Sequence, residues 1–297
     1  MEHSRTRGAG HDLPARPYLR TTPRLSYVEP EQPLLQRALI SAVERLSGRE
    51  RLQAVYDELK SEPFELSRFF DRALALADID VQLDTPPGGA GIPREGPIVF
   101  VANHTFGIVD GLILCRLAAQ TRGDFRVLLH ARLCQDADLA PYFLPVDFMA
   151  TAQARATNLQ TRKAAAQTLR EGGTLVIFPG GGVATAPHGR GAAQEFPWSP
   201  FVARLVYQNR AAVVPVHFHG QNSRLFHVAS AVSDSLRAAL LLHEARNKIG
   251  RCFRVSVGRT IPYEALEPLR DRAALTRTLL ARVAALGVGA TDESDAA

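Results

Sequence analysis

A histidine and a carboxylate lie close together in the sequence, just after an apolar segment. Asn103 and His104 directly follow the run Ile98–Ala102, and Asp110 comes shortly after them. Gly107 lies between the two and can take backbone angles closed to other residues, so the loop can bring the carboxylate back to the ring. A carboxylate that hydrogen-bonds one imidazole nitrogen leaves the other able to take a proton from a hydroxyl. The spacing predicts a His–Asp general base, against the alternative of an ordinary strand-to-helix turn with polar residues.

The segments around this pair alternate between short apolar stretches and longer amphipathic ones. This alternation predicts an α/β fold with a mostly parallel central sheet flanked by helices. In such sheets ligands bind at the carboxyl ends of the strands, which groups residues 103–110 with 180–184 and 219–222. The expected strands are 98–102, 125–130, 174–179, 212–219 and 253–258, and the expected helices are 109–120, 155–171, 200–209, 233–248 and 271–285.

The chain ahead of this alternation has a different pattern. Residues 31 to about 77 have helical periodicity, and the Pro- and Gly-rich segment 84–97 is typical of a loop. We therefore expect a small N-terminal helical appendage before the sheet. The expected parts are a disordered arm at 1–30, a helical region at 31–83, an α/β domain at 84–286 and a disordered tail at 287–297.

The composition favours a protein of a reducing compartment that meets anionic partners. The net charge is +5 and nearly all the positive charge is arginine, which binds phosphate and carboxylate through a bidentate fork. We expect an anionic membrane surface or phosphorylated substrates as partners, and no nucleic acid, because no nucleic-acid motif occurs. The three cysteines are far apart and lack metal-ligand spacing, so neither a disulfide framework nor a metal site is expected. No apolar run approaches the roughly 20 residues that span a bilayer, and the start of the chain lacks the apolar core of a signal peptide.

Two further stretches accompany the His–Asp segment. VANHTFGIVDG at 101–111, FPGGGVATA at 178–186 and VVPVHFHGQNS at 213–223 together resemble the glycerolipid acyltransferase family, in particular its haemolysin-like and ornithine-lipid branch. Members of this family move a fatty acyl chain from acyl-CoA or acyl carrier protein to a lysophospholipid hydroxyl. The resemblance covers about residues 90–260 and implies that His104 is the general base and Asp110 its orienting partner.

The sequence departs from the family's motifs at two of these stretches. The family has four residues between the histidine and the aspartate, whereas this chain has five, a spacing found in the branch named above. The family's third motif is Phe-Pro-Glu-Gly-Thr. Phe178, Pro179 and Gly181 match it, but Gly180 and Gly182 stand in place of its Glu and Thr. A carboxylate expected to contact the substrate is therefore absent from residue 180.

We expect substrate contacts from the loops around the His–Asp pair. Backbone N–H groups of residues 180–182 are candidates for stabilising a tetrahedral oxyanion, since glycine lets the backbone approach closely. The family's second motif supplies an arginine for the acceptor phosphate, and in LPVDFMATAQAR (144–155) the nearest substitute is Arg155, unless it belongs to a solvated helix face. Gln221, Asn222 and Ser223 at the exit of a strand either contact the substrate or cap a following helix. The expected substrate-binding residues are Asn103, Gly107, Arg155, Phe178, Pro179, Gly180, Gly181, Gly182 and Asn222.

Three other features have competing interpretations. His217 and His219 alternate on one expected strand, and we interpret them as packing or hydrogen-bonding residues rather than zinc ligands. The expected helix at 233–248 and the segment around Trp198 belong either to the core or to a membrane-facing surface.

The sequence therefore predicts an acyltransferase that uses acyl-CoA or acyl carrier protein as co-substrate and needs no cofactor. The acceptor is the hydroxyl of a lysophospholipid or a similar lyso-lipid. We expect the protein in the cytoplasm, bound peripherally to the inner face of an anionic membrane. One alternative is an N-acyltransferase of an amino-acid lipid, and another is a non-catalytic lipid-binding protein with a degenerate site. A serine hydrolase is disfavoured because GxSxG is absent from the sequence.

Overall fold

The computed structural model describes residues 19–20, 23, 28, 33–46, 48–269 and 271–288. The arm expected to be disordered, residues 1–30, lies almost entirely outside the described residues, and so do residues 289–297 of the expected tail. The expected start of the tail at residue 287 is too early, because the last helix continues through Val288.

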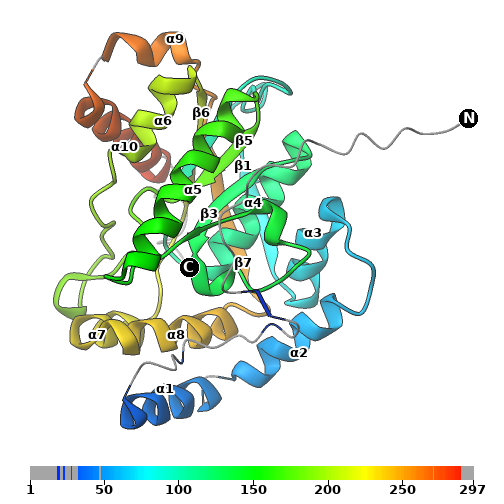
Figure 1. Ribbon diagram of the computed structural model, residues 1–297, viewed down its shortest axis with the longest axis vertical. Helices are drawn as coiled ribbons and strands as arrows, with labels where there is room; N and C mark the ends of the chain where they lie inside the picture. Colours follow the sequence, from blue (N-terminus) through cyan, green and yellow to red (C-terminus); the bar gives the residue numbers. More distant parts are fainter. Residues whose placement is uncertain are drawn as a thin grey trace, which may run out of the picture.

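The fold is a seven-stranded mixed sheet with helices on both faces (Figure 1). The strands lie in the order β1-β7-β6-β2-β5-β3-β4. Five neighbouring strands from β6 to β4 are parallel, whereas β7 pairs antiparallel with β6, and β1 pairs parallel with β7. The strands are β1 (Asp80–Asp84), β2 (Ile98–Ala102), β3 (Arg126–His130), β4 (Phe143–Val146), β5 (Thr174–Ile177), β6 (Ala212–Phe218) and β7 (Cys252–Val257). This architecture confirms the α/β fold with a mostly parallel sheet.

Two groups of helices cover the sheet (Figure 1), and α7 and α8 lie across one end of the molecule near α1 and α2. The helices are α1 (Leu34–Leu46), α2 (Arg49–Leu59), α3 (Leu66–Leu76), α4 (Ile108–Arg122), α5 (Ala152–Arg170), α6 (Phe201–Asn209), α7 (Arg224–Val232), α8 (Asp234–Asn247), α9 (Tyr263–Leu266) and α10 (Arg272–Val288).

The strand β2 shows why the sheet is covered on both sides. Its five residues, IVFVA, are all fully buried. Ile98 and Phe100 pack into the core beneath α3 and α4, whereas Val99 and Val101 pack into the opposite core beneath α5, α6 and α10. Successive side chains of a strand point to opposite faces, so a continuous apolar run is what a central strand of a two-sided sheet requires.

The expected helical region at 31–83 is wrong at its C-terminal end. Helix α3 ends at Leu76, and strand β1 begins at Asp80 and pairs with β7 along its whole length. None of the five residues of β1 is fully buried, because the strand lies at the edge of the sheet. An edge strand with polar residues at Asp80, Gln82 and Asp84 lacks the apolar run that identifies a central strand.

Strand β4 and helix α7 also have no counterpart among the elements expected from the sequence. Strand β4 forms the opposite edge of the sheet and has only four residues, one of them a proline, which is tolerated at an edge. Helix α7 begins directly after the loop that follows β6, and Ser223 caps it by accepting a hydrogen bond from the Phe226 N–H. The capping interpretation of residues 221–223 is therefore confirmed for Ser223.

Candidate active site

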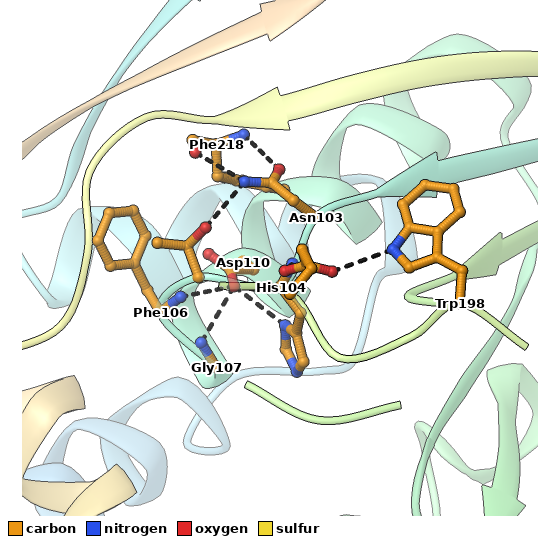
Figure 2. A network of polar contacts seen from close by, with 9 residues as sticks. Asn103, His104, Phe106, Gly107, Asp110, Trp198 and Phe218 are labelled. Carbon is orange, nitrogen blue, oxygen red and sulfur yellow. Dashed lines mark hydrogen bonds and ion pairs between the residues drawn. The ribbon is translucent and has the colours of Figure 1, made fainter. Parts of the chain in front are cut away.

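The turn from β2 into α4 brings Asp110 back to His104 (Figure 2). Asp110 is fully buried in the first turn of α4, and its Oδ2 lies 3.0 Å from the Nδ1 of His104. The same oxygen accepts the backbone N–H groups of Phe106 at 2.7 Å and Gly107 at 3.1 Å. Three donors thus converge on one carboxylate oxygen and fix both the side chain and the N-terminus of the helix.

Gly107 makes this turn possible. It is the N-cap of α4 and has φ 85° and ψ −110°, a backbone conformation that residues other than glycine rarely adopt. A Cβ at this position would also lie 3.1 Å from the Leu241 Cδ2 and 3.3 Å from the Val183 Cγ2. The structure therefore agrees with the expectation that this glycine allows the five-residue spacing between histidine and aspartate to close.

We predict that Gly107→Ala lowers kcat about 10-fold, because a displaced turn separates His104 from Asp110. The strained backbone should also lower the free energy of unfolding by about 1–3 kcal/mol. Gly111→Ala is the matched control, since it lies in the same helix and an added Cβ there meets nothing within 4 Å. Steady-state kinetics and chemical denaturation measure both effects. Equal kcat values for the two variants would contradict the role of Gly107.

The imidazole of His104 is held on one side and open on the other. Its ring stacks on Phe178, with centroids 4.2 Å apart and an interplanar angle of 26°. Its Nε2 points away from Asp110 (Figure 2) and hydrogen-bonds no residue in the described part of the chain. The side chain is 18% exposed, so a substrate group can reach it. Phe178, which was expected to bind substrate, therefore packs against the imidazole of His104.

The glycine loop after β5 begins next to Phe178, the residue that stacks on the His104 ring. Gly181 has φ 69°, and its N–H closes a turn onto the Phe178 carbonyl. Among the candidate oxyanion donors of this loop, the Gly181 N–H is therefore already engaged. The N–H groups of Gly180 and Gly182 donate to no group in the described residues. The carbonyl of Pro179 accepts the Ser199 N–H, which ties this loop to the segment that follows it.

The side chain of Asn103 holds two strand ends together. Its Nδ2 donates to the Phe218 carbonyl and to the Thr105 Oγ1, both at 2.9 Å, and its Oδ1 accepts the Phe218 N–H at 2.8 Å. These bonds join the end of β2 to the end of β6 (Figure 2). Because each end of the amide is already engaged and the residue is buried, Asn103 shapes the site and does not offer a free group to a substrate.

Glu195 was not expected in the site, but its carboxylate contacts the backbone of His104. Glu195 Oε1 accepts the His104 N–H at 2.8 Å, and Oε2 accepts the indole N–H of Trp198 at 3.1 Å. Burial raises the pKa of this carboxyl above its ordinary value, while the two N–H donors and the nearby imidazole oppose the rise. The contact joins a side chain to a backbone amide far away in the sequence, so no motif or residue spacing predicts it.

Comparisons with known proteins identify the family to which this chain belongs. A family model described as "Acyltransferase" matches residues 88–276, which include β2, the His–Asp turn, the glycine loop and Glu195. The chain belongs to this acyltransferase family. The family assignment confirms the predicted resemblance and shows that the protein is an enzyme that transfers acyl groups.

Two curated relatives and one solved structure are similar to this acyltransferase. The lyso-glycine lipid O-acyltransferase of Phocaeicola vulgatus is 25% identical over 216 residues, which are 69% of this chain and 72% of the relative. The enzyme of the same name from Bacteroides thetaiotaomicron is 25% identical over 215 residues, covering 69% and 74%. The crystal structure of the 1-acyl-sn-glycerophosphate (LPA) acyltransferase PlsC from Thermotoga maritima aligns with 84% of this chain and 93% of its own at 14% identity and a TM-score of 0.47.

Two residues expected to bind substrate in this acyltransferase lie away from the His–Asp pair. Arg155 is exposed in the first turn of α5, which follows β4, and β4 lies three strands from β2, roughly 14 Å across the sheet. Asn222 is buried at the start of α7, with both polar atoms of its amide unpaired among the described residues. Neither side chain is brought into contact with His104 by this structure.

The remaining interpretations concern the two histidines of β6 and the segments at Trp198 and α8. His219 Nε2 lies 2.8 Å from the Ser256 Oγ, and burial lowers the pKa of His217 to about 4. Within the described residues, no group of three or more His, Cys, Asp and Glu side chains is arranged to hold a metal ion. Trp198 is buried in the core beneath α5, α6 and α10, and α8 buries Leu242 and Ala245, so both segments contribute to the interior.

Proposed function

We propose that this acyltransferase moves a fatty acyl group from acyl-CoA or acyl carrier protein to the hydroxyl of a lyso-lipid, with His104 as the general base. The contact of 3.0 Å between the His104 Nδ1 and the Asp110 Oδ2 supports this most directly. The carboxylate accepts a hydrogen bond from the Nδ1–H, so the neutral ring has its lone pair at the outward Nε2. That nitrogen can accept a hydroxyl proton in the open side of the site.

The proposed reaction is a direct transfer. The acceptor oxygen attacks the thioester carbonyl carbon while His104 Nε2 takes the hydroxyl proton, and Asp110 stabilises the imidazolium that forms. The tetrahedral intermediate collapses, the carbon–sulfur bond breaks, and the imidazolium returns the proton to the leaving thiolate. The products are an ester and a free thiol, so atoms and charge balance. The unpaired N–H groups of Gly180 and Gly182 are the proposed donors to the oxyanion.

The names of the relatives favour a hydroxyl acceptor. Both similar curated proteins are lyso-glycine lipid O-acyltransferases, so an amino-acid lyso-lipid is the acceptor class that we place first for this chain. A lysophospholipid is the second candidate. No contact in the described structure favours an amine over a hydroxyl. We propose O-acylation because both relatives are named as O-acyltransferases.

The decisive experiment offers the purified protein several acceptors with acyl-CoA and, separately, with acyl carrier protein. The panel contains lyso-glycine lipid, lysophosphatidic acid, lysophosphatidylethanolamine and an amine-bearing precursor. Mass spectrometry identifies the product, and mild alkaline treatment cleaves an ester but not an amide. We expect an alkali-labile product that His104→Ala does not form. An alkali-stable product would establish N-acylation, and no product with any pair would contradict the proposed function.

We further propose that α7 binds an anionic lipid surface. Leu225, Val228 and Val232 are 54%, 50% and 73% exposed and recur along one face of this helix. Arg224 is exposed on the same helix, whose sequence RLFHVASAV contains no acidic residue. Apolar side chains beside a cation and without anions suit the boundary between lipid head groups and acyl chains. No helix in the described part of the chain is long and apolar enough to cross a membrane.

The inner face of α7 connects this surface with the site. Phe226 is completely buried and packs with Val183 and Leu240. Val183 in turn lies beside Gly107, as shown by the short distance to a Cβ built there. A lipid bound at α7 would therefore be connected through Phe226 and Val183 to the turn that positions Asp110.

We predict that the double substitution Leu225→Glu and Val228→Glu weakens binding to anionic vesicles at least 10-fold, because two apolar anchors are replaced by anions. Sedimentation with vesicles of phosphatidylglycerol and phosphatidylcholine measures binding, and kcat with a water-soluble short-chain acceptor should stay unchanged. Leu159→Glu is the matched control, since Leu159 is 55% exposed on α5. Equal vesicle binding by the α7 variant and the control would exclude α7 as the docking surface.

A further inference from the structure

The carboxylate of Glu195 is fixed within the site from both of its oxygens. Oε1 accepts the His104 N–H at 2.8 Å and Oε2 accepts the Trp198 indole N–H at 3.1 Å. Trp198 is only 6% exposed, and its ring packs in the core under α5, α6 and α10. A carboxylate with one well-buried anchor and one contact to the residue that bears the proposed base has little freedom to move.

Gly180 leaves the space that this carboxylate occupies. A Cβ built on Gly180 would lie 3.1 Å from the Glu195 Oε2 and 3.2 Å from the Phe196 carbonyl oxygen. Gly180 is not among the glycines with positive φ, so its backbone conformation is open to other residues and the lack of a side chain is a matter of space. The carboxylate of Glu195 therefore lies where a side chain of residue 180 would begin.

The ionisable groups near Glu195 come from the other side of the site. His104 on the loop after β2 and Asp110 on α4 are the charged or titratable groups that act on it electrostatically. Asp110 contacts the ring of His104, and Glu195 contacts its backbone, so the histidine is held by one carboxylate at each end. A second anion near the ring stabilises the imidazolium that forms when His104 takes a proton.

We propose that Glu195 is a positioning residue for His104 and supplies, from the segment before α6, the carboxylate that residue 180 lacks. The proposal rests on the proposed role of His104 as general base. The missing Glu of the motif is thereby replaced in space by a residue that lies fifteen positions later in the chain. The space beside Gly180 thus holds one carboxylate, and that carboxylate belongs to Glu195.

The first test is Glu195→Gln, which keeps the size of the side chain and removes its charge. The glutamine can accept from only one of the two N–H groups, because its amide nitrogen is itself a donor. We expect kcat to fall about 10- to 100-fold with KM within about 2-fold of the wild type. The acid limb of the pH profile should also move to lower pH, because the anion that stabilises the imidazolium is gone. Glu58→Gln, at an exposed position on α2, is the matched control.

The second test moves the carboxylate back to residue 180. Glu195→Ala alone should lose activity about as much as Glu195→Gln, and Gly180→Glu alone should lose activity because two carboxylates then compete for one space. The double variant Gly180→Glu with Glu195→Ala should regain at least 5-fold over Glu195→Ala. A double variant no more active than Glu195→Ala would contradict the shared position of the two carboxylates.

Failure of this inference is distinguishable from failure of the proposed function. Wild-type kcat and an unchanged pH profile in Glu195→Gln, with activity abolished in His104→Ala, would overturn the role of Glu195 alone. If the wild type transfers no acyl group, the NMR signal of the His104 backbone N–H in the full chain still tests Glu195, because that N–H donates to the Glu195 Oε1. We expect Glu195→Ala to shift this signal and Glu58→Gln to leave it unchanged, and an unmoved signal in Glu195→Ala would overturn the proposal.

Discussion

Replacing His104 by alanine is expected to lower kcat by about 10³- to 10⁴-fold, the contribution that a positioned general base makes. The imidazole is the one group that links the buried Asp110 carboxylate to the open side of the site, and its Nε2 has no other partner in the described chain. KM should change little, because the ring is proposed to act on the proton and not to hold the lipid. Kinetics with the best donor and acceptor from the panel measure this.

His104→Ala should remain folded. The ring is partly exposed, and Asp110 keeps its two backbone donors from Phe106 and Gly107 after the ring is lost. His243→Ala is a matched control, because His243 lies two residues after Leu241 and so faces another side of α8. A variant that keeps more than about a tenth of wild-type kcat would show that the ring is not the base, since general-base catalysis is worth far more.

The second large effect is expected for Asp110→Asn, which should lower kcat about 10²- to 10³-fold. All three donors to Asp110 converge on Oδ2, whereas Oδ1 has no hydrogen-bond partner among the described residues. An asparagine can therefore keep all three bonds only with its oxygen in the place of Oδ2. In that orientation the ring keeps its tautomer, and what the variant loses is the negative charge that stabilises the imidazolium.

The same orientation has a consequence for stability. The amide nitrogen of the introduced asparagine would replace the buried, unpartnered Oδ1 of Asp110, and a buried NH₂ group without an acceptor costs about 1–3 kcal/mol. Chemical denaturation should show this loss together with the fall in kcat. Asp110→Ala should destabilise the protein as well, because the Phe106 and Gly107 N–H groups then lose their acceptor at the start of α4. An Asp110→Asn variant with wild-type kcat would remove the carboxylate from the mechanism.

The sequence is sufficient to predict the centre of the fold and insufficient for its edges. Strand β2 is a continuous apolar run because both of its faces are covered, and such a run stands out against the helices around it. Strand β1 has three polar residues among five and lies at an exposed edge, whereas β4 is mostly buried but has only four residues, one of them a proline. Hydrophobic periodicity needs both burial and length, so an exposed strand and a very short strand each leave little signal.

The candidate site divides in the same way. His104 and Asp110 lie within one turn of chain, so their pairing follows from residue types, spacing and the permissive Gly107 between them. The contact of Glu195 with the His104 N–H depends on how the segment before α6 folds over the glycine loop. Because any residue other than proline has a backbone N–H, no pattern of side chains in the sequence could have identified this partner.

The pairing of β1 with β7 also determines the order in which the molecule can be completed during its synthesis. Residues 80–84 leave the ribosome early, but their partner at 252–257 is made only after β2, β5 and β6. The strands that carry the His–Asp turn and the glycine loop can therefore pair with one another before β1 has anywhere to bind. Until that final step the N-terminal helices are attached to a strand without a partner, an exposed edge prone to association with other chains. The strand that carries His104 can thus find its two neighbours while the edge at β1 is still open, and that edge is covered only once β7 has been made.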